Sequence, residues 1–335
     1  MTLLTRRECA ALAAGLVLSS KAALAEPVRN KQDWSKLRDH VLAGMREVMG
    51  PLPESPQGPP EVAILEESSF PEFIRKKLTF ASGDGDLVPA YLFLPRKAKG
   101  KKPAVLCLHQ TTAIGKAEPA GLGGKPNLHY ALELAERGFV TLAPDYPGYG
   151  DYKIDAYAMG YISATMKGIR NHRRAVDLLV SMPEVDRRRI GVIGHSLGGH
   201  NSLFVAAFDP RVAAVITSCG FTSFAKYYGG NLNGWSHKGY MPRIASVYGK
   251  SPEKMPFDFP GILQALAPRP VFINAPLHDA NFDASGVDDC VKAAEPIYSG
   301  VFHAKGALQI VHPDCAHDFP PEVRTSAYDF LVRSL

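Results

Sequence analysis

The stretch Gly194-His195-Ser196-Leu197-Gly198 decides the fold, because it joins two segments of different character. Residues 190–193 before it form an apolar run typical of a buried strand, and residues 197–208 after it are rich in alanine and predict a helix. A turn this sharp strains the serine and leaves room only for small neighbours. The pattern predicts a nucleophile elbow, with the Ser196 hydroxyl at the sheet edge and the Leu197 N–H facing a forming oxyanion. The alternative is an ordinary serine in a strand-to-helix turn.

Apolar runs alternate with helical segments along the chain. The predicted buried strands are residues 104–108, 140–143, 190–193, 212–216, 271–273 and 307–311. The predicted helices are residues 127–137, 164–181, 197–208, 287–299 and 321–334. Strands that are apolar on both faces suit a parallel sheet covered by helices on two sides. We therefore expect an α/β fold with a doubly wound, mostly parallel sheet.

Three further segments define the expected domain organisation. Residues 26–60 form an N-terminal extension with an amphipathic helix (34–49) and a Pro-rich linker. Residues 61–335 form one α/β domain, which begins with a hairpin of strands 74–80 and 87–94. Within it, residues 221–268 carry many aromatics with little periodicity. We expect this segment to be a cap over the carboxyl edge of the sheet, where ligands bind in such folds.

Residues 1–25 have the pattern of a signal peptide. The basic pair Arg6-Arg7 precedes an apolar run at 10–18 that is too short to span a bilayer, and Ala23-Leu24-Ala25 fits a cleavage site. The basic pair resembles a twin-arginine signal, although Cys9 stands where a bulky apolar residue is usual. We expect export to the periplasm or the medium, with no membrane span in the mature chain. The alternative is an amphipathic helix that stays attached.

Composition and charge exclude several classes of protein. The chain has 335 residues, of which 46% are hydrophobic and 21% are charged, as in ordinary folded proteins rather than disordered or collagen-like ones. The net charge of +5, from 38 basic and 33 acidic residues, is small and scattered. The charge therefore does not indicate a basic surface that would bind nucleic acid. The oligomeric state stays open.

Four cysteines follow the predicted cleavage site. Cys107 and Cys219 lie in or beside apolar strand-like runs and are expected to be buried free thiols. Cys290 and Cys315 could pair in an oxidising compartment. No Cys-x-x-Cys and no His/Cys cluster with metal spacing occurs in the sequence. We expect neither a metal nor a cofactor.

A serine nucleophile needs a base that an acid orients, and in this kind of fold the order along the chain is Ser, Asp, His. Asp279 follows the predicted strand 271–273 and is the candidate acid, with Asp283 as the alternative. His317 lies in the loop between the last strand and the last helix and is the candidate base. His312, closer to the strand, is expected to be a structural histidine.

The remaining candidates surround this constellation. A second oxyanion donor is expected from the loop after strand 104–108, from the N–H of Gln110 or, preferably, of Thr111. Gln110, Trp235 and Tyr240 are the candidate substrate-binding residues. For the two aromatics, the alternative is packing in the core of the cap.

Four motifs carry a resemblance to a known family. They are residues 143–150 (Ala-Pro-Asp-Tyr-Pro-Gly-Tyr-Gly), 183–186 (Pro-Glu-Val-Asp), 267–270 (Ala-Pro-Arg-Pro) and 317–319 (His-Asp-Phe). With the elbow, Asp279 and His317, residues 75–335 resemble the α/β-hydrolase superfamily, in its dienelactone-hydrolase-like and acetylxylan-esterase-like branch.

The resemblance implies a serine esterase that works by two-step acyl transfer on a small-molecule or carbohydrate ester, with acetyl esters of carbohydrates as the narrower expectation. True dienelactone hydrolases carry cysteine as nucleophile, so Ser196 favours ester hydrolysis instead. The alternatives are a serine peptidase of the prolyl-oligopeptidase type and a non-catalytic binding protein on the same fold.

Overall fold

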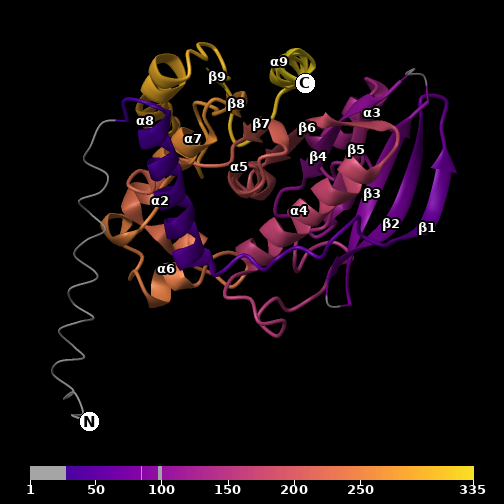
Figure 1. Ribbon diagram of the computed structural model, residues 1–335, viewed down its shortest axis with the longest axis horizontal. Coiled ribbons are helices and arrows are strands. Elements are labelled where there is room, and N and C mark those ends of the chain that lie inside the picture. Colours follow the sequence, from indigo (N-terminus) through magenta and orange to yellow (C-terminus); the bar gives the residue numbers. More distant parts are fainter. Residues whose placement is uncertain (1–27, 84, 97–99) are drawn as a thin grey trace, which may run out of the picture.

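A nine-stranded sheet organises the part of the chain that the computed structural model describes, which comprises residues 28–83, 85–96 and 100–335 (Figure 1). The strand order is β1-β2-β3-β5-β4-β6-β7-β8-β9. The expected signal peptide, residues 1–25, lies outside the described residues. Within the described ranges, no helix is long and apolar enough to cross a bilayer.

The sheet is antiparallel at one end and parallel over the rest. Strands β1, β2 and β3 pair antiparallel, as do β3 and β5, whereas β5, β4, β6, β7, β8 and β9 pair parallel. The strands are β1 (Val62–Ser69), β2 (Phe73–Gly83), β3 (Asp86–Pro95), β4 (Lys102–Leu108), β5 (Val140–Pro144), β6 (Val185–His195), β7 (Val212–Ser218), β8 (Val271–Asn274) and β9 (Leu308–Val311). The predicted hairpin and the mostly parallel sheet are confirmed.

Helices cover both faces of this sheet (Figure 1). The α-helices of the described ranges are α2 (Lys31–Met49), α3 (Tyr130–Glu136), α4 (Ala164–Ser181), α5 (Leu197–Phe208), α6 (Arg243–Ser246), α7 (Phe259–Leu266), α8 (Ala284–Pro296) and α9 (Pro321–Ser334). On β4, Val105 packs in one apolar cluster with α3 and α9, and its neighbour Leu106 packs in the other with α4 and α5. Burial on both faces explains why the parallel strands are continuous apolar runs.

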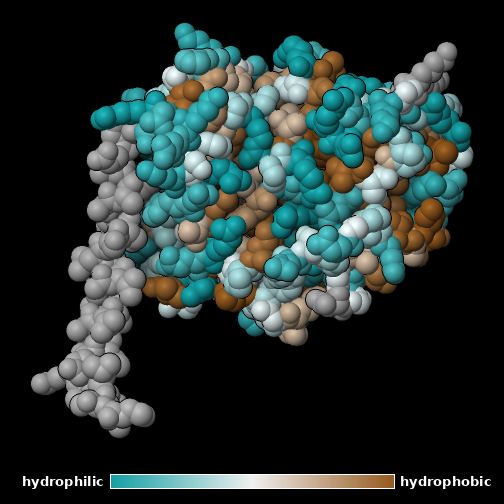
Figure 2. Space-filling model, viewed as in Figure 1, coloured by the Kyte–Doolittle hydropathy of each residue, from teal (hydrophilic) through white to brown (hydrophobic). Residues whose placement is uncertain are grey.

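Strand β1 is absent from the sequence-based prediction. Its first six residues are all exposed, so the alternation of buried and exposed positions that marks a strand is missing. Val62, Ile64 and Leu65 are among these exposed positions, and hydrophobic residues are visible at this edge of the sheet (Figure 2). Pairing with β2 defines the strand instead.

The segment between β7 and β8, which includes residues 221–268, lacks strands and contains α6, α7 and several 3-10 turns. Its aromatic side chains pack on one another, with ring centroids of Trp235 and Phe259 5.4 Å apart and those of Phe224 and Phe259 5.5 Å apart. The low periodicity of this segment therefore reflects short turns around an aromatic core.

Helix α2 packs against this same segment. The indole of Trp34 donates to the Gln264 carbonyl in α7 at 2.9 Å. Near the other end of α2, the Glu47 carbonyl accepts from Arg243 at 2.7 Å, and the Glu47 carboxylate accepts from the Tyr248 hydroxyl at 2.5 Å. Helix α2 thus holds the segment 221–268 at α7 and near α6.

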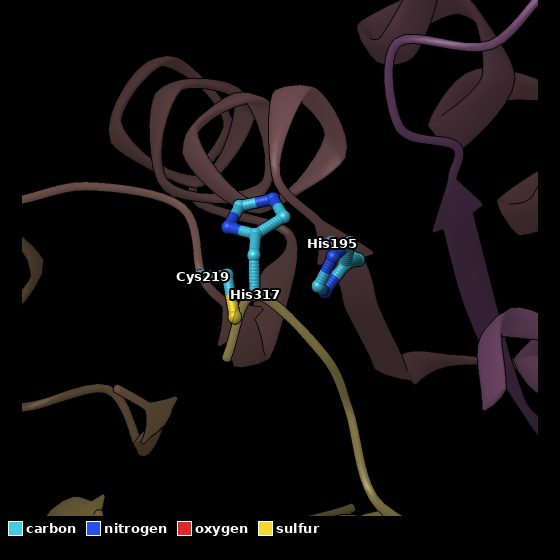
Figure 3. A group of neighbouring side chains, drawn as sticks. All are labelled: His195, Cys219 and His317. Atoms are coloured by element: carbon cyan, nitrogen blue, oxygen red, sulfur yellow. The ribbon is translucent and has the colours of Figure 1, made fainter. Parts of the chain in front are cut away.

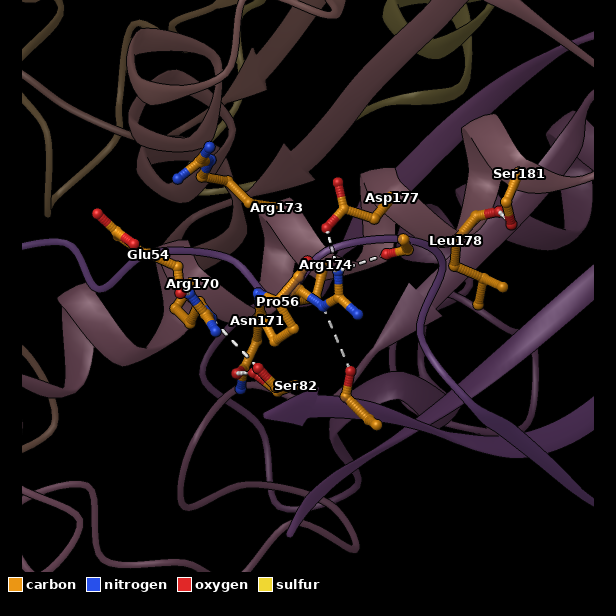
Figure 4. A network of polar contacts seen from close by, with 12 residues as sticks. Glu54, Pro56, Ser82, Arg170, Asn171, Arg173, Arg174, Asp177, Leu178 and Ser181 are labelled. Atoms are coloured by element: carbon orange, nitrogen blue, oxygen red, sulfur yellow. Dashed lines mark hydrogen bonds and ion pairs between the residues drawn. The ribbon is translucent and has the colours of Figure 1, made fainter. Parts of the chain in front are cut away.

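Two buried arginines of α4 hold the Pro-rich stretch that follows α2 (Figure 4). Arg170 donates to the carbonyls of Pro53 (2.9 Å) and Glu54. Arg174 donates to the carbonyl of Pro56 at 3.2 Å and to Asp177 at 2.5 Å. Guanidinium groups suit this task because one side chain serves several acceptors. The Pro-rich stretch is therefore fastened to the sheet domain.

Candidate active site

Ser196 lies in a strained turn between β6 and α5. Its φ of 54° and ψ of −115° place a non-glycine residue in a backbone region that glycine favours. The flanking glycines are required by close packing: a Cβ on Gly198 would collide with the Leu108 carbonyl, and one on Gly199 would lie 2.7 Å from the Gly220 Cα. The turn has the geometry of a nucleophile elbow.

The backbone N–H of Leu197 is the first of helix α5 and, like other first-turn N–H groups, has no acceptor within the helix. The His200 N–H donates to the Ser196 carbonyl at 3.2 Å, which begins the regular helix. The positive end of the helix dipole therefore faces the Ser196 side chain, where negative charge on a substrate oxygen would be stabilised.

The loop after β4, from which the second oxyanion donor is predicted, contacts the segment 221–268. The Thr111 hydroxyl lies 3.1 Å from the Tyr240 hydroxyl, so Tyr240 from the segment 221–268 contacts this loop. The Gln110 side chain donates to Glu118 at 3.0 Å. Gln110 and Tyr240 thus lie around the predicted oxyanion loop, with the Gln110 amide engaged by Glu118.

His109 holds this loop, a role that the sequence analysis did not assign. Its Nε2 accepts from the Tyr146 N–H at 2.9 Å, so its Nδ1 carries the proton and donates to the Gln110 carbonyl at 2.6 Å. Burial lowers the pKa of His109, which keeps the ring neutral in this bridging tautomer. The available signal was its position directly after the buried strand β4.

His317 and Asp279 form the pair that the sequence order predicts. The Nδ1 of His317 lies 2.8 Å from Oδ2 of Asp279, and the Asp279 side chain is 1% exposed. The other carboxylate oxygen accepts from the backbone N–H groups of Asn281 (2.8 Å) and Phe282 (3.2 Å). The aspartate is therefore held on both sides, and a neutral His317 that donates from Nδ1 has its lone pair on Nε2.

The two alternatives to this pair have other contacts. Asp283 caps helix α8 by accepting from the Ser285 N–H at 2.8 Å, and the Ser285 hydroxyl lowers the pKa of that carboxyl. His312 bridges the Ala275 carbonyl (2.7 Å) and Asp288 (3.0 Å), as expected of a structural histidine. Of the two carboxylates considered, Asp279 is the one that contacts His317.

Two further side chains surround His317 (Figure 3). The ring of His195 lies 4.7 Å from that of His317, edge to face, and its Nδ1 is 2.9 Å from the Ser218 hydroxyl. Cys219 follows β7 with a φ of 47°, and its thiol donates to the Asp318 carbonyl at 3.3 Å. The sequence analysis missed this grouping, because the three residues are far apart along the chain.

Trp235 packs in the aromatic core of the segment 221–268. Packing in the core was the alternative to substrate binding in the sequence analysis. Trp235 is 2% exposed, and its ring packs against His200 with centroids 4.7 Å apart. Tyr240 is only partly buried, and its ring lies 4.3 Å from that of His237. Tyr240 is therefore better placed than Trp235 to touch a bound molecule.

The possible pairing of Cys290 with Cys315 is wrong. All four described cysteines are free thiols. Cys290 points into the hydrophobic core under α8, whereas Cys315 lies partly exposed in the loop after β9. Cys107 and Cys219 are buried free thiols, as expected, and burial raises the pKa of both.

The comparisons with known proteins show that the protein is a carboxylic ester hydrolase. They also show that it has the α/β-hydrolase fold. Residues 88–329, more than half of the chain, match the model of the Dienelactone hydrolase family, and the chain belongs to this family. The predicted resemblance is thereby confirmed.

Individual relatives extend this result. YtaP of Bacillus subtilis (strain 168), named as a hydrolase, is 27% identical over 300 residues, which cover 86% of this chain and 96% of that protein. Acetyl esterase Axe7A of Xylanibacter ruminicola is 28% identical over 187 residues, 49% of this chain and 39% of that protein. A glucuronoyl esterase from Solibacter usitatus has the same fold, with a TM-score of 0.75, 19% identity and coverage of 92% of this chain and 95% of that one.

Proposed function

We propose that the protein is a serine esterase in which Ser196 is the nucleophile, His317 the general base and Asp279 the acid that orients it. The observation that carries the proposal is the 2.8 Å contact between His317 Nδ1 and the buried Asp279 carboxylate, at the same edge of the sheet as the strained Ser196. That contact keeps the proton on Nδ1 and leaves Nε2 free to accept one from a serine hydroxyl.

The reaction proceeds in two steps. His317 takes the proton of Ser196 as the oxygen attacks the ester carbonyl, and Asp279 stabilises the imidazolium. The N–H groups of Leu197 and Thr111 stabilise the oxyanion. His317 then protonates the leaving alcohol and activates water to release the acid. Neither step draws on a metal or a cofactor.

The substrate class that we propose is acetyl esters of carbohydrates. The relationship to an acetyl esterase supports this narrower assignment. Tyr240 contacts the predicted oxyanion loop through the Thr111 hydroxyl and is only partly buried, so it offers a hydroxyl and an aromatic face to a sugar.

The test compares three proteins on one panel of esters. The wild type is expected to hydrolyse acetylated xylo-oligosaccharides and short p-nitrophenyl esters, with acetyl preferred to butyryl and feruloyl, and to take one phosphonate label per chain at Ser196. The Ser196→Ala variant should lose both properties. The Ser202→Ala variant, whose hydroxyl bonds the Gly198 carbonyl in the same helix, should keep both.

Three results would contradict the proposal. Hydrolysis of peptide substrates with no ester hydrolysis would favour a peptidase, and the absence of both activities and of the label would favour a binding protein. Activity retained in the Ser196→Ala variant would show that Ser196 is not the nucleophile.

We also propose that the protein is exported and that residues 1–25 are removed. The basic pair and the cleavage pattern of this segment support the idea. Mass spectrometry of the protein from a bacterial periplasmic fraction should show an N-terminus at Glu26, and an Arg6→Lys, Arg7→Lys double variant should accumulate as a cytoplasmic precursor. A processed double variant would argue against the twin-arginine route.

A further inference from the structure

Three potential metal ligands converge at the candidate base. One ligand atom each from His195, Cys219 and His317 lies within 4.8 Å of the other two. They come from the end of β6, the residue after β7 and the loop after β9, and the close view shows the three side chains beside one another (Figure 3). Two imidazoles and a thiol are a donor set that zinc prefers.

The group of His195, Cys219 and His317 is largely buried and is not a chance cluster of surface side chains. His195 is fully buried, and its Nε2 has no hydrogen-bond partner, so a buried polar atom stands unsatisfied. Such an atom costs free energy unless a partner compensates it. Cys219 is 2% exposed, whereas the His317 side chain is 18% exposed and gives access from solvent.

A buried carboxylate beside the group favours a cation. The Asp279 side chain is 1% exposed, and its Oδ2 lies 2.8 Å from Nδ1 of His317. Because this carboxylate contacts one of the three ligands, its negative charge would partly compensate that of a bound divalent ion.

We propose that His195, Cys219 and His317 form an inhibitory binding site for Zn²⁺. Two ligand atoms on one tetrahedral zinc are about 3.3–3.8 Å apart, so small side-chain rotations would bring the three into range. Binding forms one Zn–S bond and two Zn–N bonds and releases the thiol proton to solvent, without any change of oxidation state. A water molecule takes the fourth position.

Zinc at this site would stop the reaction, and this consequence rests on the proposed role of His317. A neutral imidazole has one lone pair. Whichever nitrogen of His317 binds the ion, that lone pair is used, and the ring can no longer accept the Ser196 proton. Inhibition should therefore be complete and reversible by a chelator.

The first arm of the test measures inhibition. Hydrolysis of p-nitrophenyl acetate by the wild type is titrated with ZnCl₂ and then with EDTA. The Cys219→Ser variant should need at least about tenfold more zinc for half-inhibition of its own activity, because one of three ligands is lost. The Cys315→Ser variant is the matched control: it removes a neighbouring thiol outside the group and should keep the wild-type value.

The second arm does not depend on activity. Co²⁺ added to the Ser196→Ala variant should produce a sulfur-to-cobalt charge-transfer band, which a further Cys219→Ala change removes and a further Cys315→Ser change keeps. Absence of the band in the Ser196→Ala protein overturns the proposal, as does equal zinc sensitivity of wild type and Cys219→Ser. If the wild type hydrolyses no ester, the proposed function fails while the cobalt spectrum still decides the metal site.

Discussion

Replacing Asp279 by asparagine tests the proposed base most directly. The structure predicts which way the new amide would point: Oδ1 already accepts from the N–H groups of Asn281 and Phe282, so the amide oxygen stays there. The amide NH₂ then faces Nδ1 of His317, where Oδ2 is now 2.8 Å away. Two donors cannot face each other, so the Nδ1 proton moves to Nε2. His317 would then be unable to accept the serine proton.

The expected loss follows from this change of tautomer. An inverted tautomer of the catalytic histidine costs about 10⁴-fold in kcat in a serine protease, a difference of about 5 kcal/mol in activation free energy. We expect kcat for p-nitrophenyl acetate at pH 7.5 to fall by about this factor. The melting temperature should change little, because the two backbone hydrogen bonds to the side chain are kept.

The matched control is Asp283→Asn, which changes the other carboxylate of the same loop. It removes the negative charge at the start of α8, while the amide oxygen can still accept from Ser285. It does not touch His317, so kcat should stay within about threefold of the wild type. A loss of less than about tenfold in Asp279→Asn, or a larger loss in Asp283→Asn, would refute the assignment.

Three further outcomes follow from other parts of the structure. Lys116→Met removes the ammonium that lies 2.8 Å from the fully buried Asp145 carboxylate and so leaves that charge unpaired. Urea unfolding should show a free energy of unfolding lower by about 3–5 kcal/mol, and adding Asp145→Asn in a double variant should recover part of this stability. Gly198→Ala drives a Cβ into the β4 carbonyl and should reduce both activity and stability, the latter by about 1–3 kcal/mol, whereas Gly300→Ala meets no atom within 4 Å and should be neutral by both assays. Burial lowers the pKa of His172 from 6.5 to about 3, so on acidification the unfolded chain binds a proton at this residue before the folded chain does. The free energy of unfolding should therefore fall as the pH drops below 6.5, and it should fall less steeply in His172→Gln. Urea midpoints at pH 7, 6 and 5 would show the difference.

Sequence patterns were sufficient for the elements whose ends carry local signals. Helices α4, α5 and α9 begin and end where predicted, because Ser163 caps the first, the elbow starts the second and Pro321 starts the third. The sequence-based prediction missed strand β1 for the opposite reason. Its residues face solvent at the edge of the sheet, so its position depends on pairing with β2, which no local pattern reveals.

The candidate site divides in the same way. The order of Ser196, Asp279 and His317 along the chain was predictable, because each follows its own strand. The contacts of His195 and Cys219 with His317 depend on β6 and β7 being neighbours in the sheet. The positions were visible as residues at strand ends, but strand order is decided by packing of the whole sheet. The tie between Gln110 and Glu118 likewise needs the folded loop.

The attachment of α2 to the segment 221–268 has a kinetic consequence. Trp34 and Glu47 anchor that segment from behind at Gln264, Arg243 and Tyr248. A segment fastened in this way is not expected to swing like the lid of an interfacial lipase, so access to the partly exposed Ser196 should not depend on a lipid surface. Turnover should therefore rise with substrate along a simple saturation curve, with no jump in rate when the ester begins to form micelles.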